Sequence, residues 1–138
     1  MADEMDEIIS DFVTEAEESL EKIDPLFVEL EIRGHDKDML NEIFRSMHTI
    51  KGAAGFLGFQ LIVDVAHKAE SIMKKLRDDE IGMSTSLMDV ILKSCDMLRL
   101  LLQHIKNKDG KEEDTAWLLK ELSQAMKGAK SGDAFAAA

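Results

Sequence analysis

The sequence contains few residues that break helices or cross-link a chain. Its 138 residues include one proline, one cysteine and no tyrosine. Because the single cysteine, Cys95, cannot form an internal disulfide, we expect a reducing compartment and a cytoplasmic location. The shortage of proline and tyrosine, beside many Leu, Ile, Met, Glu and Lys residues, favours helices over strands.

Features of secreted, membrane-inserted and nucleic-acid-binding proteins are also missing. The acidic first residues have neither the basic nor the apolar region of a signal peptide. No apolar run approaches the ~18 residues that span a bilayer, so we expect no direct membrane insertion. A formal net charge of −11 repels phosphates, which argues against nucleic acid as a partner. The mixture of 45% hydrophobic and 33% charged residues is typical of a globular domain.

Apolar residues recur with helical spacing in five segments, which short polar or glycine-containing breaks separate. The spacing predicts helices over about 3–31, 37–56 and 60–78, a fourth from about 84 to the break at 107–110, and a shorter fifth around 117–126. Pro25 should bend or divide the first helix, because proline lacks an N–H and crowds the preceding turn. Asp36 is the expected N-cap of the second helix.

Short connections make neighbouring helices antiparallel. The pattern therefore predicts an all-α fold, an antiparallel up-and-down four-helix bundle with an additional fifth C-terminal helix. We expect one domain over residues 1–130. Residues 131–138 show no periodicity and are expected to be a disordered tail or the start of a linker.

One segment, from Met47 to Phe59, concentrates glycines in or just beyond a predicted helix. A glycine inside a helix costs about 1 kcal/mol relative to alanine, so their presence needs a reason. Lys51, Gly52 and Gly55 lie within roughly 60° of His48 around the helix axis. His48 itself lies roughly 100° from the centre of the apolar stripe. The spacing thus predicts an imidazole at the core boundary, with a cation one turn away and bare backbone beside it.

Each of these features suits phosphoryl transfer. A neutral imidazole is nucleophilic near pH 7, since its ordinary pKa is about 6.5. Lys51 could stabilise the charge on phosphoryl oxygens. Gly52 and Gly55 carry no side chain and would let the active site of a partner approach His48. The alternative is an ordinary histidine at a helix edge, with glycines that merely permit close helix packing.

The stretch His48-Thr49-Ile50-Lys51-Gly52-Ala53-Ala54-Gly55-Phe56-Leu57-Gly58-Phe59 resembles the phosphoacceptor motif of histidine phosphotransfer (Hpt) domains. Within that family it is most similar to the Hpt domains of CheA-type chemotaxis histidine kinases, through its Gly-Phe-Leu-Gly-Phe flank and the later Ala66-His67-Lys68-Ala69-Glu70. The similarity covers about residues 8–82, with looser agreement to about 128.

The resemblance implies that His48 is phosphorylated on Nε2 and that Glu70, on the next helix, hydrogen-bonds the other ring nitrogen. The spacing independently places Glu70 roughly 100° from the stripe centre of its own helix, as His48 is on the preceding one. A carboxylate there would select the tautomer and raise the basicity of the free nitrogen. His67 lies one turn from Glu70, so we expect a cluster of His48, Lys51, Glu70 and His67.

The same resemblance implies a place in a two-component chemotaxis system. A separate ATP-binding kinase catalytic domain would phosphorylate His48, and response regulators of the CheY and CheB kinds would accept the phosphoryl group on aspartate. We find no glycine-rich nucleotide loop, so the chain would belong to a histidine protein kinase without holding its ATP site. We expect no cofactor and no metal here, with ATP and Mg²⁺ in the partner domains.

Three alternatives stay open. The first has the same chemistry and is a free-standing Hpt protein of a phosphorelay. The second is a helical docking module without chemistry, for which nine methionines would provide an adaptable surface. The third is a metal-binding bundle, although only Asp64 and His67 show the carboxylate-to-histidine spacing of di-iron bundles and no second copy exists.

Four further side chains have simpler interpretations. His35 lies in a glycine-containing loop and is expected in solvent, whereas His104 near the end of the fourth helix suits the helix dipole. Cys95 is expected to be a small buried apolar residue, and Trp117 part of the core of the fifth helix or of its packing seam.

Overall fold

Three of the helices in the described residues begin at a capping side chain. The computed structural model describes residues 3–129, which form five α-helices and no strand beyond the single bridge residue Ile81. The helices are α1 Glu4–Arg33, α2 Lys37–Leu57, α3 Gln60–Arg77, α4 Thr85–Asn107 and α5 Ala116–Gly128. The side chains of Asp3, Asp36 and Ser84 each accept a hydrogen bond from a first-turn backbone N–H, and so cap α1, α2 and α4.

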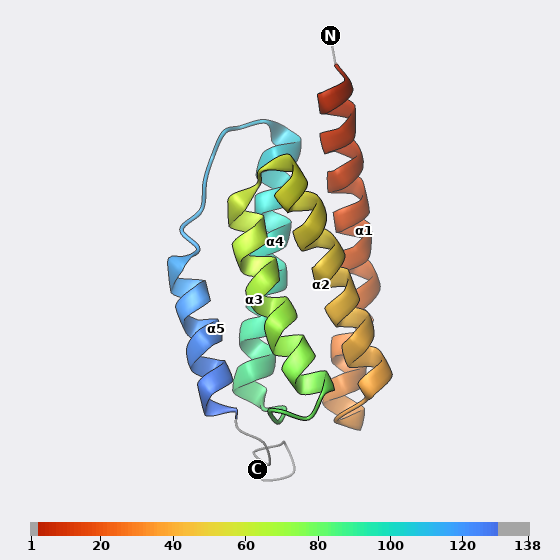
Figure 1. The fold of residues 1–138 in the computed structure, drawn as a ribbon, viewed down its shortest axis with the longest axis vertical. Coiled ribbons are helices and arrows are strands. Elements are labelled where there is room, and N and C mark those ends of the chain that lie inside the picture. The colour runs from red at the N-terminus through yellow and green to blue at the C-terminus, as the bar shows by residue number, and fades with distance from the viewer. Residues whose placement is uncertain (1–2, 130–138) are drawn as a thin grey trace.

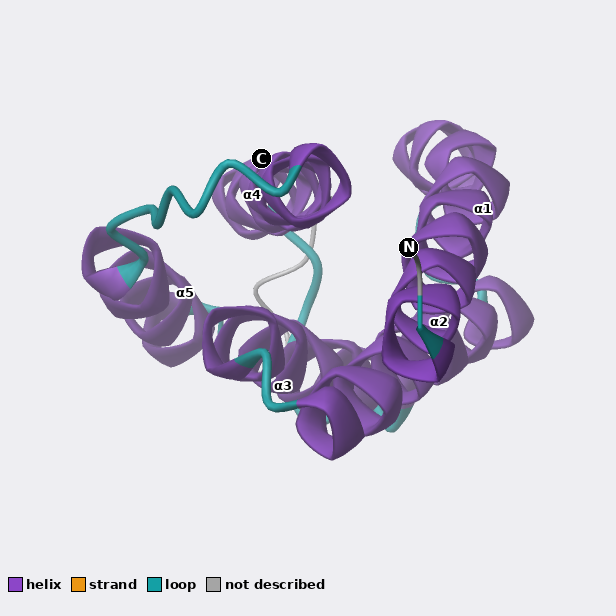
Figure 2. Cartoon of the chain, turned by 90° about the horizontal axis from the view of Figure 1, so that it is seen from above, coloured by secondary structure: helices purple, strands orange, loops and turns teal. Residues whose placement is uncertain are grey.

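Consecutive helices run in opposite directions (Figure 1). α1 packs against α2 and α4, and α3 packs against the same two helices, so the four surround one core. α5 lies outside this ring, against α3 and α4 (Figure 2). The predicted all-α, up-and-down four-helix bundle with a fifth C-terminal helix is confirmed.

The apolar stripe of α2 faces the bundle interior. All its members are at most 2% exposed, namely Leu40, Ile43, Met47, Ile50 and Ala54. Burying an aliphatic side chain of this size contributes about 1.5–3 kcal/mol, so this stripe sets the rotation of α2 about its axis. His48 is therefore held at the boundary between core and solvent, where its spacing from the stripe placed it.

The turn between α2 and α3 aligns these two helices. Gly58 ends α2 in the left-handed region with φ 82°, and its N–H bonds the carbonyl oxygens of Ala54 and Gly55. A residue with a Cβ is strained in that conformation, which is why glycine stands there. Only Phe59 separates Gly58 from the start of α3. The short turn brings α2 and α3 side by side, with His48 on one helix and Glu70 on the other.

Pro25 lies inside α1, which runs without interruption from Glu4 to Arg33. The prediction that Pro25 divides this helix is therefore wrong. Proline removes the bond to the carbonyl of the residue four positions earlier, here Glu21. Both Pro25 and Glu21 are exposed, so water can satisfy that carbonyl and the buried face of α1 keeps its hydrogen bonds.

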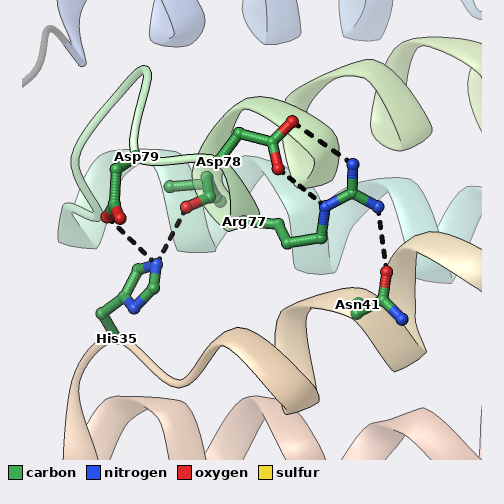
Figure 3. A network of polar contacts seen from close by, with 6 residues as sticks. His35, Asn41, Arg77, Asp78 and Asp79 are labelled. Carbon is green, nitrogen blue, oxygen red and sulfur yellow. Dashed lines mark hydrogen bonds and ion pairs between the residues drawn. The ribbon is translucent and has the colours of Figure 1, made fainter.

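The tryptophan differs from its sequence interpretation, and two histidines have partners that the sequence did not reveal. His35 is exposed, as expected, and its Nε2 also lies 3.0 Å from the carbonyl oxygen of Leu76 and 3.2 Å from Oδ1 of Asp79 (Figure 3). The two ring nitrogens of His104 lie 2.9 Å from Asp109 and 2.6 Å from Glu113. Trp117 is 45% exposed, so its expected place in the core is wrong.

The carboxylates that His104 binds lie in the connection to α5, and the spacing along a single helix does not reveal such partners. Cys95 is buried, as predicted, and burial raises the pKa of its thiol to about 12. The predicted tail at 131–138 lies outside the described residues. Within residues 3–129, no helix has a stretch both long and apolar enough to cross a membrane.

Candidate functional site

His48 projects from α2 with one ring nitrogen engaged. Its Nδ1 lies 2.5 Å from Oε2 of Glu70 on α3, while 62% of the side chain is exposed. A carboxylate can only accept, so this contact assigns the proton of the neutral ring to Nδ1. Nε2 then carries the lone pair, and it has no hydrogen-bond partner within residues 3–129. The accessible nitrogen of the imidazole is the nucleophilic one.

Glu70 is a carboxylate buried to 8% exposure at the seam between α2 and α3. Its second oxygen, Oε1, accepts a hydrogen bond of 2.8 Å from Nζ of Lys51. Burial alone would raise the pKa of Glu70, but the hydrogen bonds and charges of Lys51 and His48 outweigh it and hold that pKa below its ordinary value of 4.5. Glu70 is therefore ionised at neutral pH and presents a charge to each of its two partners.

The spacing suggested that Lys51 faces phosphoryl oxygens at His48, but its immediate partner in the structure is Glu70. Its ammonium is bound by Glu70 at 2.8 Å, and its side chain keeps 26% of its surface exposed. The lysine lies one turn from His48 on α2, so it stands beside the imidazole while held by the same carboxylate. His48 and Lys51 are thus fixed relative to each other through Glu70.

The glycines beside His48 are not required by packing. A Cβ at Gly52 would meet nothing within 4 Å, and one at Gly55 would meet only Cγ2 of Val63 at 3.9 Å, an ordinary contact. The alternative that these glycines permit close helix packing is therefore wrong. They leave open backbone next to His48, and Phe56 beside them is 82% exposed. The backbone at the two glycines and the Phe56 ring together form an open, partly apolar surface beside His48.

The sequence as a whole matches a known family. A model of the Hpt domain matches residues 7–132 of the chain. The chain belongs to the Hpt domain family. Sensor histidine kinase CheAY of Helicobacter pylori is 37% identical over 137 residues, which cover 93% of this chain and 17% of that protein. Chemotaxis protein CheA of Rhizobium meliloti is 30% identical over 126 residues, covering 91% of this chain and 17% of that protein. The chain thus spans about a fifth or less of the length of these curated relatives.

Solved structures have the same fold. The solution structure of the histidine phosphotransfer domain of CheA superimposes with a TM-score of 0.77 at 32% identity, covering 94% of this chain and 96% of that one. The phosphorylated P1 domain of CheA3 from R. sphaeroides, in complex with CheY6, also gives a TM-score of 0.77, over 90% of this chain and 98% of that one. Its sequence identity is 20%, so this second likeness concerns the fold alone.

His67 was also expected in the cluster with His48, but it lies outside it. It is exposed on α3, and within residues 3–129 its imidazole makes no hydrogen bond or ion pair. Lys51 occupies the Glu70 oxygen that the bond from His48 leaves available. The hydrogen-bonded cluster therefore contains three residues rather than four. No group of three or more His, Cys, Asp or Glu side chains in this range is arranged to hold a metal ion.

Two neighbours of His48 were missed from the sequence. The ring of Phe44 stacks on the His48 imidazole, with centroids 6.0 Å apart and planes at 17°. The guanidinium of Arg77 lies over the Phe44 ring, 4.7 Å from its centroid. Phe44 precedes His48 by four residues, a spacing that brings side chains together on a helix, and this signal could have found it. Arg77 comes from α3 and had no such signal.

The lowered pKa of Glu70 gives the Hpt domain a specific acid sensitivity. A carboxyl with a lowered folded-state pKa contributes stability above its unfolded value, here 4.5, and this contribution is lost as the pH falls through the folded value. We expect the free energy of unfolding to fall more steeply below pH 4.5 for the wild type than for Glu70→Gln. Urea titrations from about pH 7 to about pH 3 measure it. Parallel pH curves for the two proteins would contradict the assignment.

Proposed function

We propose that this Hpt domain carries a phosphoryl group on Nε2 of His48, between a kinase catalytic domain and an aspartate of a response regulator. The observation that carries the proposal is the 2.5 Å contact of Nδ1 with Glu70, beside an otherwise exposed imidazole. ATP is the phosphodonor, bound with Mg²⁺ in the kinase catalytic domain. The receiving aspartate has its own Mg²⁺ site, so no cofactor is assigned to these residues.

The chemistry follows from the protonation of His48. The Nε2 lone pair attacks the γ-phosphorus of ATP, an N–P bond forms, and the bond to the ADP oxygen breaks. The ring keeps its proton on Nδ1 and becomes positively charged, so the carboxylate of Glu70 stabilises the phosphorylated state more than the free one. In the second transfer an aspartate oxygen attacks the phosphorus, the N–P bond breaks, and the neutral imidazole returns.

Lys51 completes the electrostatic environment of the proposed transfer. The phosphoryl group in flight spreads negative charge over its oxygens, and a fixed cation nearby lowers the barrier. Glu70 holds the Lys51 ammonium through a 2.8 Å bond, next to the ring that would carry the phosphoryl group. Lys51 thus supplies charge without needing to be reoriented.

Both partners would approach the surface formed by Gly52, Gly55 and Phe56. The glycines remove side chains beside the imidazole, and the exposed Phe56 ring offers an apolar contact. The kinase catalytic domain and the response regulator would use this surface in turn, because each must bring its phosphoryl-binding site to Nε2 of His48. The kinship with CheA proteins favours regulators of the CheY and CheB kinds and a role in cytoplasmic chemotaxis signalling, over a free-standing phosphorelay protein.

The test is a two-step transfer with the Hpt domain as a separate protein. It is incubated with γ-labelled ATP and a CheA kinase catalytic domain, and then with a CheY-type response regulator. We expect acid-labile, alkali-stable label on the Hpt domain in the first step and loss of that label to the regulator in the second. No label from a catalytic domain that phosphorylates another Hpt domain would refute the proposal and favour the docking alternative.

A further inference from the structure

The Glu70 bond leaves one orientation of the His48 ring undetermined. A single hydrogen bond at Nδ1 decides which nitrogen is free, but the ring can still tilt about the line that joins Nδ1 to the carboxylate oxygen. With 62% of the side chain exposed, few packing contacts oppose this tilt. For transfer between two proteins the direction of the Nε2 lone pair matters as much as its availability, because reacting atoms must align.

Phe44 supplies the missing constraint. Its ring is nearly parallel to the imidazole, at 17° between the planes with centroids 6.0 Å apart. Offset stacking in this distance range is a favourable arrangement for two aromatic rings. The stacked ring opposes tilting of the imidazole plane, which the bond from Glu70 does not. The two contacts restrict different motions of the same side chain.

Arg77 in turn fixes Phe44 from the neighbouring helix. Its guanidinium lies 4.7 Å from the centre of the Phe44 ring, a cation–π contact. The guanidinium is itself held on two sides, by both carboxylate oxygens of Asp78 at 2.9 and 3.3 Å and by the side-chain oxygen of Asn41 at 2.9 Å (Figure 3). A planar fork bound in this way has little freedom. The guanidinium that contacts Phe44 is therefore held in place by its own hydrogen bonds to Asp78 and Asn41.

We propose that Phe44, held by Arg77, is a positioning residue that fixes the plane of the His48 imidazole for phosphoryl transfer between proteins. This inference rests on the proposed function. Phe44 acts through His48 and touches no phosphoryl group. Its contribution is confined to reactions in which a second protein site must align with Nε2. A small phosphodonor that diffuses freely can approach the ring from whichever direction it faces.

The experiment compares two phosphodonors on wild type and Phe44→Leu. Leucine keeps an apolar side chain in place of Phe44 but has no flat face. With ATP and a kinase catalytic domain, we expect kcat to fall about two- to tenfold, the range to which aromatic-pair coupling energies convert, while KM for the Hpt domain stays unchanged. With phosphoramidate, which phosphorylates histidine directly, we expect the two proteins to react at the same rate.

Two further variants exclude a general structural effect. Phe44→Tyr keeps the flat ring and should restore the wild-type kcat. Phe12→Leu removes another aromatic pair, the stack of Phe12 on Phe59 with centroids 5.8 Å apart, and should leave kcat unchanged. In the NMR spectrum, the His48 ring protons should lose their ring-current shift in Phe44→Leu and keep it in Phe44→Tyr. Circular dichroism confirms that each variant is folded.

The possible outcomes are distinct. An equal loss with both phosphodonors would place the effect on the nucleophilicity of His48 and overturn the positioning role. A rise in KM alone would make Phe44 a docking residue, and an unchanged kcat would remove it from the reaction; either result overturns the inference. If the wild type itself takes no label from the active kinase domain, the proposed function fails instead. The phosphoramidate reaction distinguishes that outcome from a defect caused by the substitution of Phe44.

Discussion

We expect His48→Gln to carry no phosphoryl label after incubation with ATP and an active kinase catalytic domain. Glutamine approximates the size and polarity of histidine but offers no basic nitrogen to attack phosphorus. The side chain is 62% exposed and lies outside the core, so the substitution should change the free energy of unfolding by no more than about 0.5 kcal/mol. The loss of label would thus be a loss of chemistry, and autoradiography together with thermal unfolding measures both.

Controls for this substitution are the histidines that do not contact His48. His35→Gln and His104→Gln leave the 2.5 Å bond from His48 to Glu70 intact and should take label like the wild type. Full labelling of His48→Gln, with label on another histidine, would contradict the assignment of the phosphoacceptor. A pure docking module would bind its partners equally well before and after the substitution, and pull-down of the response regulator tests that alternative.

Removing the carboxylate beneath His48 should give the second-largest effect. We expect Glu70→Ala to slow phosphorylation of His48 by about 10- to 100-fold, the usual range for loss of a carboxylate that orients a functional histidine. Two contributions are lost, namely selection of the Nδ1–H tautomer and stabilisation of the positive ring that forms on phosphorylation. Glu70→Gln should have a smaller effect, because its amide oxygen can still accept the Nδ1–H bond although it carries no charge.

The bundle should remain folded in both variants. Glu70 lies at the edge of the α3 stripe, whose apolar members include the fully buried Ala69 and Met73. Single-turnover phosphorylation at saturating kinase domain, with circular dichroism on the same samples, separates rate from folding. A rate for Glu70→Ala within about twofold of the wild type would remove Glu70 from the mechanism.

The fold was predictable because the apolar residues of each helix recur with helical spacing. The spacing of apolar residues predicted α2 and the other helices, and Asp36 caps α2 as expected. Of the two expected effects of Pro25, bending or dividing α1, division does not occur, and the carbonyl that proline frees can bind water. Around Pro25 the exposed face of α1 provides that water, and this depends on where the neighbouring helices lie.

The site was predictable where it is local and unpredictable where it joins helices. His48, Lys51, Gly52 and Gly55 share one helix, so their spacing alone places them together. The partnership of His48 with Glu70 was anticipated by family resemblance and matching helical positions. The bond from Lys51 to Glu70 and the absence of His67 from the cluster were not, because both depend on how α2 and α3 pack together.

The sequence by itself determined the helices, their buried faces and the histidine at the edge of one such face. These properties follow from spacing of apolar residues and from capping side chains, which act within about one turn of chain. Only the tertiary structure decided the contact of Arg77 with Phe44, the exposed position of Trp117 and the carboxylate partners of His104. Which side chains of two helices meet depends on how far the helices are shifted along their axes. The spacing of residues along one helix does not reveal that shift.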